Sequence, residues 1–311
     1  MKKIFLLFLL FFSGLFQVYS QEQLLKWIPF QWQGDTISGK YIEKAYIYVP
    51  VKIDELPVGF TMQLDLGTQD TQFYGNPIKP YLEKYPSLAN KLDSIYQKQN
   101  LIFRDVNLQM GGASFLFDVW HRIDFGEEIP QEILPSKTPI HIGTIAPDLF
   151  KDKILILDYK RTRFAVLDEL PTEYRNLPMV AFELINGMIV FPFQINGIEQ
   201  KVMFDTGSSP FPLATSKVRA MEIAHSKIVD SLSGPLWWGQ DITFYGLKVN
   251  RSIKFAGTEL EKAIVYYDKE GLWEQHVFNP LTIWGLTGNV YFLNKILIVD
   301  YKSKTLRIKS N

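Results

Sequence analysis

The chain has 311 residues, with 33 basic and 33 acidic side chains, so its formal net charge is zero. A nucleic-acid partner requires a concentrated basic surface, and this balance argues against one. The sequence contains no cysteine, which excludes disulfides and a lipid anchor attached through cysteine. Hydrophobic residues make up 47% of the chain, enough to fill the core of one large or two medium domains.

The first twenty residues, 1–20, have the anatomy of a secretory signal peptide. Two lysines precede the apolar run 4–12, which is too short to span a bilayer, and small side chains precede a cleavage point ahead of Gln21. An uncleaved anchor and a buried first strand are the alternatives, and the short apolar run disfavours both. We therefore expect a secreted or periplasmic protein with no stable membrane insertion after cleavage.

The mature chain consists mainly of short strands, rich in aromatic and β-branched residues and bounded by Pro, Gly or Asn. One helix interrupts this pattern. It is expected to begin at an N-cap at Ser87, because Leu88, Leu92 and Ile95 recur on one face before Asn100. The expected strands are 46–53, 60–64, 154–157, 164–167, 189–195, 201–204, 296–299 and 305–308.

Three sequence blocks occur twice in the chain, in the same order. Residues 142–160 and 284–302 share nine identities in nineteen ungapped positions, at an offset of 142 residues. Upstream, VPVKID and FPFQIN match at the same offset. Between these two blocks lies a third, which reads MQLDLGT in the first copy and VMFDTGS in the second. The repeat predicts a duplicated lobe, with an N-terminal copy at 21–172 and a C-terminal copy at 173–311.

Each copy contains one aspartate at the end of an apolar strand, Asp65 in DLGT and Asp205 in DTGS. The glycine of this motif permits a tight turn and the close approach of another backbone, and the final hydroxyl can orient the carboxylate. If the copies pack about a pseudo-twofold axis, the carboxylates meet, and like charges about 3 Å apart share one proton. One carboxylate can then act as base on a water while the other acts as acid toward a carbonyl, the pair titrating as a unit.

These motifs give the chain a resemblance to the pepsin/retropepsin superfamily of aspartic proteases, and it looks like a bacterial two-lobed member. Each copy has the strand into the turn, a hydrophobic-hydrophobic-Gly element ending at Gly143 or Gly285, and the strand that follows. The two glycines follow their aspartates by 78 and 80 residues. The resemblance implies a mainly all-β, two-lobed acid-protease-like β-barrel fold with pseudo-twofold symmetry and a helical insertion in the first lobe.

The resemblance further implies a monomeric, exported aspartic endopeptidase that needs no cofactor or metal and binds an extended peptide or protein substrate between its lobes. Asp65 and Asp205 would be the catalytic pair. The supporting residues would be Gly67, Thr68, Thr206, Gly207 and Ser208. A β-hairpin at 107–117, with Gly111 and Gly112 at its tip, would close over the cleft as a flap.

The first copy departs from the family pattern at Leu66. Family members carry Thr or Ser after the aspartate, and this hydroxyl bridges the lobes beneath the pair; Thr206 matches and Leu66 does not. The missing bond is worth about 0.5–1.5 kcal/mol. This departure motivates an alternative, a pseudoprotease that keeps the cleft for binding without cleavage. A third interpretation, an envelope structural protein, rests on the signal peptide alone.

Other site chemistries have weaker support. The histidines at 121, 141, 225 and 276 are far apart in sequence and have no metal-ligand spacing. Ser208 and Ser209 do not lie in a Gly-x-Ser-x-Gly elbow, which disfavours a Ser-His-Asp triad. The repeated Asp158 and Asp300 follow buried strands and precede polar residues, so we assign them to turns.

Overall fold

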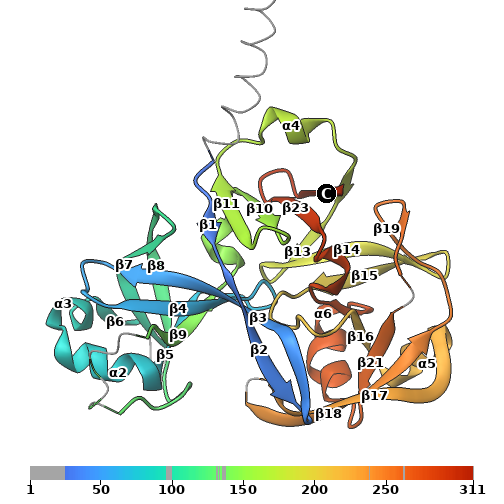
Figure 1. Ribbon diagram of the computed structural model, residues 1–311, viewed down its shortest axis with the longest axis horizontal. Coiled ribbons are helices and arrows are strands. Elements are labelled where there is room, and N and C mark those ends of the chain that lie inside the picture. The colour runs from blue at the N-terminus through green and yellow to red at the C-terminus, as the bar shows by residue number, and fades with distance from the viewer. Residues whose placement is uncertain are drawn as a thin grey trace, which may run out of the picture.

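The computed structural model describes residues 25–95, 100–130, 132, 134, 138–237, 239–261 and 263–310. The expected signal peptide at 1–20 and its cleavage point lie outside these residues. Within them the protein is mainly β and forms three sheets, which confirms the expected all-β class (Figure 1). No helix in the described ranges is long and apolar enough to cross a membrane.

The first sheet is built from residues before position 146 and contains eight strands in the described part of the chain. Strand β4 enters the first aspartate turn and lies parallel to β9, while β5 pairs antiparallel with β9 and parallel with β8. In sheet order the strands are β2 (Gln31–Ile37), β3 (Lys40–Ile53), β4 (Gly59–Leu64), β9 (Ile140–Ile145), β5 (Gln72–Tyr74), β8 (Ala113–Arg122), β7 (Asn100–Met110) and β6 (Leu92–Ile95).

The second sheet is built from residues after position 182 and repeats this arrangement. Strand β15 enters the second aspartate turn and lies parallel to β22, while β16 pairs antiparallel with β22 and parallel with β21. The strands are β17 (Ala224–Trp237), β18 (Gln240–Val249), β21 (Ile264–Asp268), β16 (Leu213–Thr215), β22 (Gly285–Thr287), β15 (Ile198–Phe204), β14 (Met188–Ile195), β19 (Ile253–Phe255) and β20 (Thr258–Glu259), with β13 (Glu183–Ile185) beside β14.

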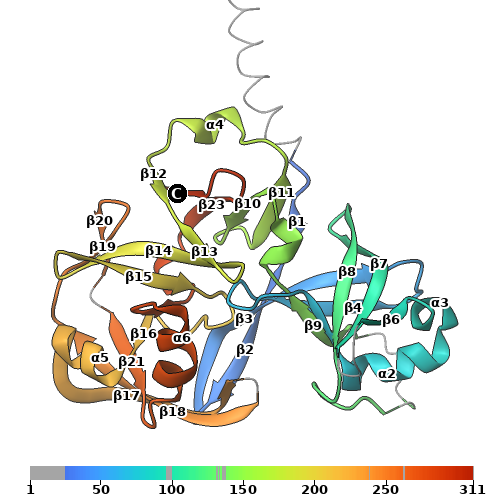
Figure 2. The same cartoon turned by 180° about the vertical axis from the view of Figure 1, so that it is seen from behind.

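The third sheet joins the two halves of the chain, and both views place it between the other two (Figures 1 and 2). At its centre β10 pairs antiparallel with β23, and Ile156 lies opposite Ile298, its equivalent in the repeat. Two equivalent residues of a repeat can lie opposite each other only where a twofold axis runs between their strands. The order is β1 (Ile28–Pro29), β11 (Arg163–Leu167), β10 (Ile154–Asp158), β23 (Lys295–Asp300), β24 (Thr305–Ser310) and β12 (Met179–Ala181).

All eight expected strands are present, but the helix expected from Ser87 is wrong in extent. Only one turn, α3 (Pro86–Ala89), forms there, and Leu92 and Ile95 belong to β6, which pairs with β7. Pairing with β7 outweighs the helical apolar pattern of this segment. The other helices are α2 (Gly75–Lys84), α4 (Thr172–Arg175), α5 (Lys217–Ile223) and α6 (Asn279–Leu281), the 3₁₀ turns η2 (Pro147–Phe150) and η4 (Val290–Phe292), and the π-helical turn η3 (Glu274–Phe278). The domain boundary expected at 172/173 falls within α4.

One continuous apolar core extends through both halves and the central sheet. The β2–β3 hairpin also crosses from the first half to the second. Its tip is tied to β17 because the Ser38 hydroxyl donates to the Ser233 carbonyl and Lys40 forms an ion pair with Asp230. Ile37 is buried in the core of the second half. The two sheets that carry the aspartate turns are therefore held in fixed relation from both sides.

Candidate functional site

Two equivalent strand ends position Asp65 and Asp205. The Asp65 N–H donates to the carbonyl of Ile145 at 2.9 Å, and the Asp205 N–H donates to the carbonyl of Thr287 at 3.0 Å. Each acceptor is the last residue of the parallel neighbour, β9 or β22. The two turns therefore begin at the same edge of equivalent parallel pairs and meet across the interface between the halves.

The glycines of the two turns allow this meeting. A Cβ on Gly67 would lie 2.2 Å from the Asp205 carboxyl carbon, and a Cβ on Gly207 would lie 2.6 Å from the Asp65 carboxyl carbon. Any other residue at either position would drive the turns apart. With glycine at both, the carboxyl groups of Asp65 and Asp205 share a hydrogen bond.

The two carboxylates have unequal sets of donors. Asp205 accepts from the N–H groups of Gly207 at 2.8 Å and Ser208 at 3.1 Å, and its other oxygen accepts from the Ser208 hydroxyl at 2.7 Å. Asp65 accepts from the Gly67 N–H at 2.9 Å. In the described contacts no hydrogen bond joins Thr68 to Asp65, and Thr68 instead lines the cleft. Negative charge is therefore better stabilised on Asp205 than on Asp65.

Burial raises the pKa of Asp65 well above its usual range, and the charge of Asp205 and the hydrogen bond between the two carboxyls raise it further. The N–H groups of Gly67 and Gly207 act in the opposite direction. A carboxyl group in this environment keeps its proton at a pH where exposed carboxyls have lost theirs.

A buried hydroxyl links the two turns beneath the carboxylates. The Thr206 hydroxyl accepts from the Leu66 N–H at 2.9 Å and donates to the Leu64 carbonyl at 2.8 Å. Leu66, the equivalent residue of the first turn, is fully buried and has no hydroxyl, so it forms no matching pair of hydrogen bonds to the second turn. A second link uses Asn289, whose amide donates to the Thr206 carbonyl at 3.0 Å and accepts from the Tyr159 hydroxyl at 2.7 Å.

The glycines of the repeated Gly element also serve close packing. A Cβ on Gly143 would lie 2.1 Å from the Gln72 carbonyl oxygen, and one on Gly285 would lie 2.3 Å from the Ala214 carbonyl oxygen. Each glycine thus lets the strand beside the aspartate turn pack directly against β5 or β16. Both glycines lie on the strands that run parallel to β4 and β15, the strands that enter the aspartate turns.

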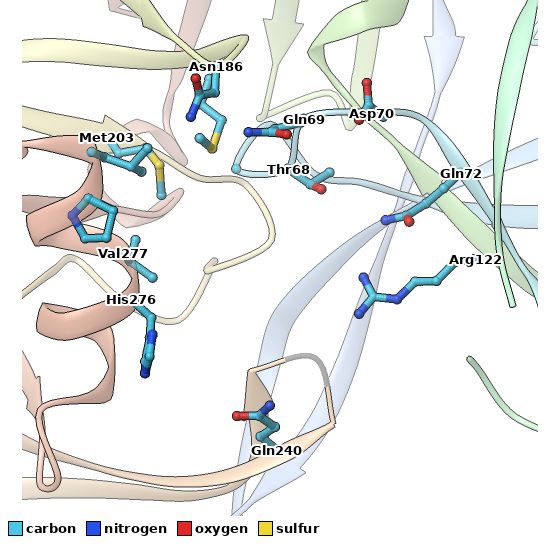
Figure 3. A pocket seen from close by; sticks show the side chains of 14 residues that line it. Thr68, Gln69, Asp70, Gln72, Arg122, Asn186, Met203, Gln240, His276 and Val277 are labelled. Carbon is cyan, nitrogen blue, oxygen red and sulfur yellow. The ribbon is translucent and has the colours of Figure 1, made fainter. Parts of the chain in front are cut away.

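The carboxyl pair lies in a pocket of about 290 Å³ between the halves of the chain. Both halves contribute to its wall. The aromatic and imidazole side chains that line it are Tyr46, Tyr74, Phe125, His141 and Trp273. A larger pocket of about 600 Å³ adjoins it and shares Gly67, Met203 and Val277 with it (Figure 3). Together the two pockets form one cleft beside the aspartates.

His141 and Tyr74 are two of the wall residues that the sequence did not predict. The His141 ring stacks on Tyr48 with centroids 4.4 Å apart and meets the edge of Tyr74 at 5.5 Å. Burial lowers the pKa of His141 to about 4, so the ring is neutral over most of the pH range. The Tyr74 hydroxyl shares a 2.5 Å hydrogen bond with the Thr144 hydroxyl, and burial raises its pKa. The direct neighbour of His141, the repeated Ile142-Gly143 element, was the available signal.

The expected flap forms a hairpin but does not cover the pair. Strands β7 and β8 are joined at Gly111 and Gly112 as predicted, yet Gly111 lies against Ile28 of β1. The tip of β17–β18 lines the cleft instead, through Gly239 and Gln240. In sheet order β17 and β18 correspond to β6 and β7, so the hairpin that lines the cleft belongs to the second half and is not the repeat equivalent of β7–β8.

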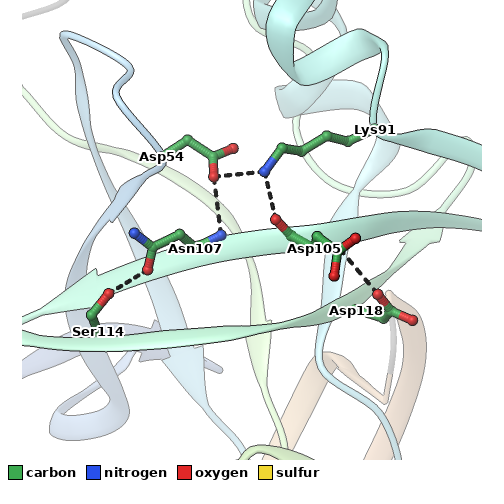
Figure 4. A network of polar contacts seen from close by, with 6 residues as sticks. All are labelled: Asp54, Lys91, Asp105, Asn107, Ser114 and Asp118. Atoms are coloured by element: carbon green, nitrogen blue, oxygen red, sulfur yellow. Dashed lines mark hydrogen bonds and ion pairs between the residues drawn. The ribbon is translucent and has the colours of Figure 1, made fainter.

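A polar network explains why β7–β8 turns away (Figure 4). Asp105 has a φ of +51° at a bulge in β7, where the Lys91 ammonium donates to its carbonyl and its N–H donates to Asp118. Lys91 also forms an ion pair with Asp54 at 2.8 Å, and Asp54 accepts from the Asn107 N–H at 3.0 Å. The bulged strand β7 is thereby fixed to Asp54, the residue that directly follows β3.

The other residues singled out in the sequence lie apart from the carboxyl pair. Asp158 accepts from the Arg161 N–H at 3.2 Å, and Asp300 accepts from the Lys302 N–H at 3.0 Å, so both serve turns as expected. Ser209 donates to the Lys44 carbonyl at 2.8 Å. In the ranges that the structure describes, no three His, Asp or Glu side chains are grouped to hold a metal ion.

No family model matches the sequence, and no curated protein matches it. The site therefore has to be interpreted from its own geometry.

Proposed function

We propose that the protein is an aspartic endopeptidase of two-lobed acid-protease-like fold, in which Asp65 and Asp205 activate a water against the peptide bond of an extended substrate. The observation that carries the proposal is the hydrogen-bonded carboxyl pair at the floor of a cleft, held by two glycine turns of the same motif. Shared protonation of two facing carboxyls is the arrangement that acid–base hydrolysis by such a pair requires.

Because Asp205 accepts more hydrogen bonds than Asp65, we assign the two carboxyl groups different roles in the reaction. Asp205, with three donors, carries the charge and removes a proton from the water, while Asp65 keeps the shared proton and gives it to the substrate carbonyl oxygen. Water oxygen bonds to the carbonyl carbon and forms a diol. Asp205 then returns its proton to the leaving nitrogen as the C–N bond breaks, and Asp65 recovers a proton from one of the diol hydroxyls. The pair ends with one proton, as it began.

The shape and lining of the cleft favour a peptide substrate over a small molecule. Its two pockets are open and continuous, and they are lined by aromatic walls near the pair and by amide side chains farther out. Aromatic surfaces accept apolar side chains, and amide groups can donate to and accept from a peptide backbone. We also propose that the chain acts outside the cytoplasm as a monomer; sequencing of the mature N-terminus would test the expected start at Gln21.

The test compares wild type with Asp65→Asn and Asp205→Asn on a diverse peptide mixture, scanned from about pH 3 to about pH 7. We expect cleavage by wild type and a loss of at least about 100-fold in each variant, because each removes one half of the acid–base exchange. Cleavage that persists in both variants would exclude the mechanism.

Ser208→Ala tests the division of roles. Removal of the Ser208 hydroxyl takes a donor from the ionised form of Asp205, so the acid limb of the kcat/KM profile should move to higher pH. Ser226→Ala, an exposed serine outside the cleft, is the matched control. An unchanged acid limb in Ser208→Ala would contradict the assignment of the charge to Asp205.

The second candidate is a pseudoprotease, which binds peptides in the same cleft without cutting them. Leu66 favours it, because the return bridge to the second turn is missing, and so does Thr68, which does not donate to Asp65. Peptide binding by wild type with no cleavage at any pH would select this candidate over the enzyme.

A further inference from the structure

We propose that Asn289 and Tyr159 are positioning residues that hold the peptide group between Thr206 and Gly207, and through it the charge of the carboxyl pair. This inference rests on the proposed function, since it assigns a role in the same reaction to two residues outside the cleft. Neither is among the described residues that line the two pockets. Their effect on the pair therefore passes through the protein and not through contact with a substrate.

The peptide group between Thr206 and Gly207 has a hydrogen-bond partner at each end. Its N–H, which belongs to Gly207, donates to the Asp205 carboxylate at 2.8 Å and also acts to lower the pKa of Asp65. Its carbonyl, which belongs to Thr206, accepts from the side-chain amide of Asn289 at 3.0 Å. A donor at the carbonyl fixes the plane of the peptide and polarises its N–H, because hydrogen bonds in a chain strengthen one another. Asn289 thereby strengthens the one N–H that acts on both carboxyl groups.

Tyr159 orients the Asn289 side chain. A carbonyl oxygen only accepts hydrogen bonds, so the amide nitrogen of Asn289 has to face Thr206 and the amide oxygen faces Tyr159. The Tyr159 hydroxyl donates to this oxygen at 2.7 Å. Tyr159 directly follows β10, its ring stacks on Trp32 with centroids 6.2 Å apart, and both it and Asn289 are buried. Burial raises the pKa of Tyr159, so the hydroxyl keeps its proton and remains a donor.

The repeat shows that this support is specific to one turn. The position equivalent to Asn289, at the offset of 142 residues, is Pro147, which has no side-chain amide. Tyr301 is the equivalent of Tyr159, and its buried hydroxyl has no hydrogen-bond partner among the residues that the structure describes. The hydrogen bonds from Tyr159 through Asn289 therefore support the turn of Asp205, to which we assign the charge, and Pro147 cannot support the other turn in this way.

The experiment measures kcat/KM against pH for Asn289→Leu and Tyr159→Phe, with Tyr301→Phe as the matched control. Asn289→Leu removes the amide donor with little change of volume, and its acid limb should move to higher pH by about half a unit, because the Asp205 anion is less well stabilised. Tyr159→Phe leaves the amide in place without its orienting donor and should move the acid limb in the same direction by less. Tyr301→Phe should leave it where it is in wild type.

A purely structural role of the two residues predicts a different result. Loss of folded protein lowers the rate without moving the acid limb, and thermal melts at each pH establish that the variants are folded. If Asn289→Leu does not fold, Tyr159→Phe decides. The other titratable side chains of the described pocket wall at the pair are Tyr46, Tyr74 and His141, and they are the same in every variant.

The outcomes separate this inference from the proposed function. Cleavage with the acid limbs of Asn289→Leu and Tyr159→Phe at the position of Tyr301→Phe would overturn the inference and leave the endopeptidase intact. If wild type cleaves no peptide at any pH, the proposed function fails, and the ¹³Cγ NMR signals of labelled aspartates decide the inference. The lower titration step of the pair, identified by its loss in Asp205→Asn, should move to higher pH in Asn289→Leu and Tyr159→Phe. A step at the wild-type pH in both variants would overturn it.

Discussion

The Thr206 hydroxyl is the buried bridge between the two turns, and Thr206→Val removes it with little change of shape. Valine replaces the hydroxyl by a methyl group. The side chain then neither accepts from the Leu66 N–H nor donates to the Leu64 carbonyl, which lie 2.9 and 2.8 Å from the hydroxyl. Thr206, Leu64 and Leu66 are all fully buried, so water does not replace the lost partner.

The cost follows from the two orphaned backbone groups. A buried donor or acceptor left without a partner costs about 1–3 kcal/mol, so loss of both partners should lower the unfolding free energy by about 2–6 kcal/mol. With about 2–4 °C of Tm per kcal/mol for a protein of this size, the expected decrease in Tm is about 4–24 °C. The same substitution at an exposed strand threonine outside any such bridge, Thr258→Val, should change stability by less than about 0.5 kcal/mol.

Urea denaturation followed by tryptophan fluorescence gives both unfolding free energies, and calorimetry gives the two Tm values. A Thr206→Val variant no less stable than Thr258→Val would refute the reasoning. It would mean that the bridge beneath the carboxyl pair does not hold the two turns together.

Three further predictions concern the pair and its wall. The raised pKa of Asp65 makes the folded state hold a proton that the unfolded chain loses above 3.8; in urea titrations the unfolding free energy of wild type relative to Asp65→Asn should therefore fall as pH rises above about 4. Gly67→Ala places a Cβ 2.2 Å from the opposite carboxyl carbon and should cost at least about 100-fold in peptide cleavage, whereas Gly59→Ala, with open space, should cost little; equal losses would contradict this. Because burial lowers the pKa of His141 from 6.5 to about 4, the unfolding free energy of wild type relative to His141→Phe should fall by about 3 kcal/mol as pH falls across that window, whereas exposed His225→Phe should track wild type.

The fold was largely predictable because the chain repeats itself. The apolar runs at 154–157 and 296–299 predicted buried strands, and they form the centre of the sheet between the halves. Equivalent segments at the same offset have to occupy equivalent places, so the aspartate turns were predicted to face each other. The helix at Ser87 failed because the apolar pattern of this segment is helical, and its pairing with β7, which the local sequence does not show, makes residues 92–95 a strand instead.

The site was predictable where its residues lie in the repeated motif and unpredictable elsewhere. Gly67 and Gly207 touch the opposite carboxyls because the motif encodes that approach. Tyr74 and Arg122 reach the site from other segments, and no local pattern distinguishes them from ordinary packing or surface residues. The prediction of a flap at 107–117 failed for a similar reason. The Gly-Gly tip can be recognised from local sequence, but the direction of the hairpin depends on a bulge and on polar contacts with residues distant in the sequence.

Peptide cleavage in water enriched in ¹⁸O tests the central claim most directly. If the carboxyl pair activates water, a single turnover by wild type adds one ¹⁸O to the new carboxyl terminus, and Asp65→Asn and Asp205→Asn give no labelled product. Labelled product formed at the wild-type rate by both variants would contradict the account.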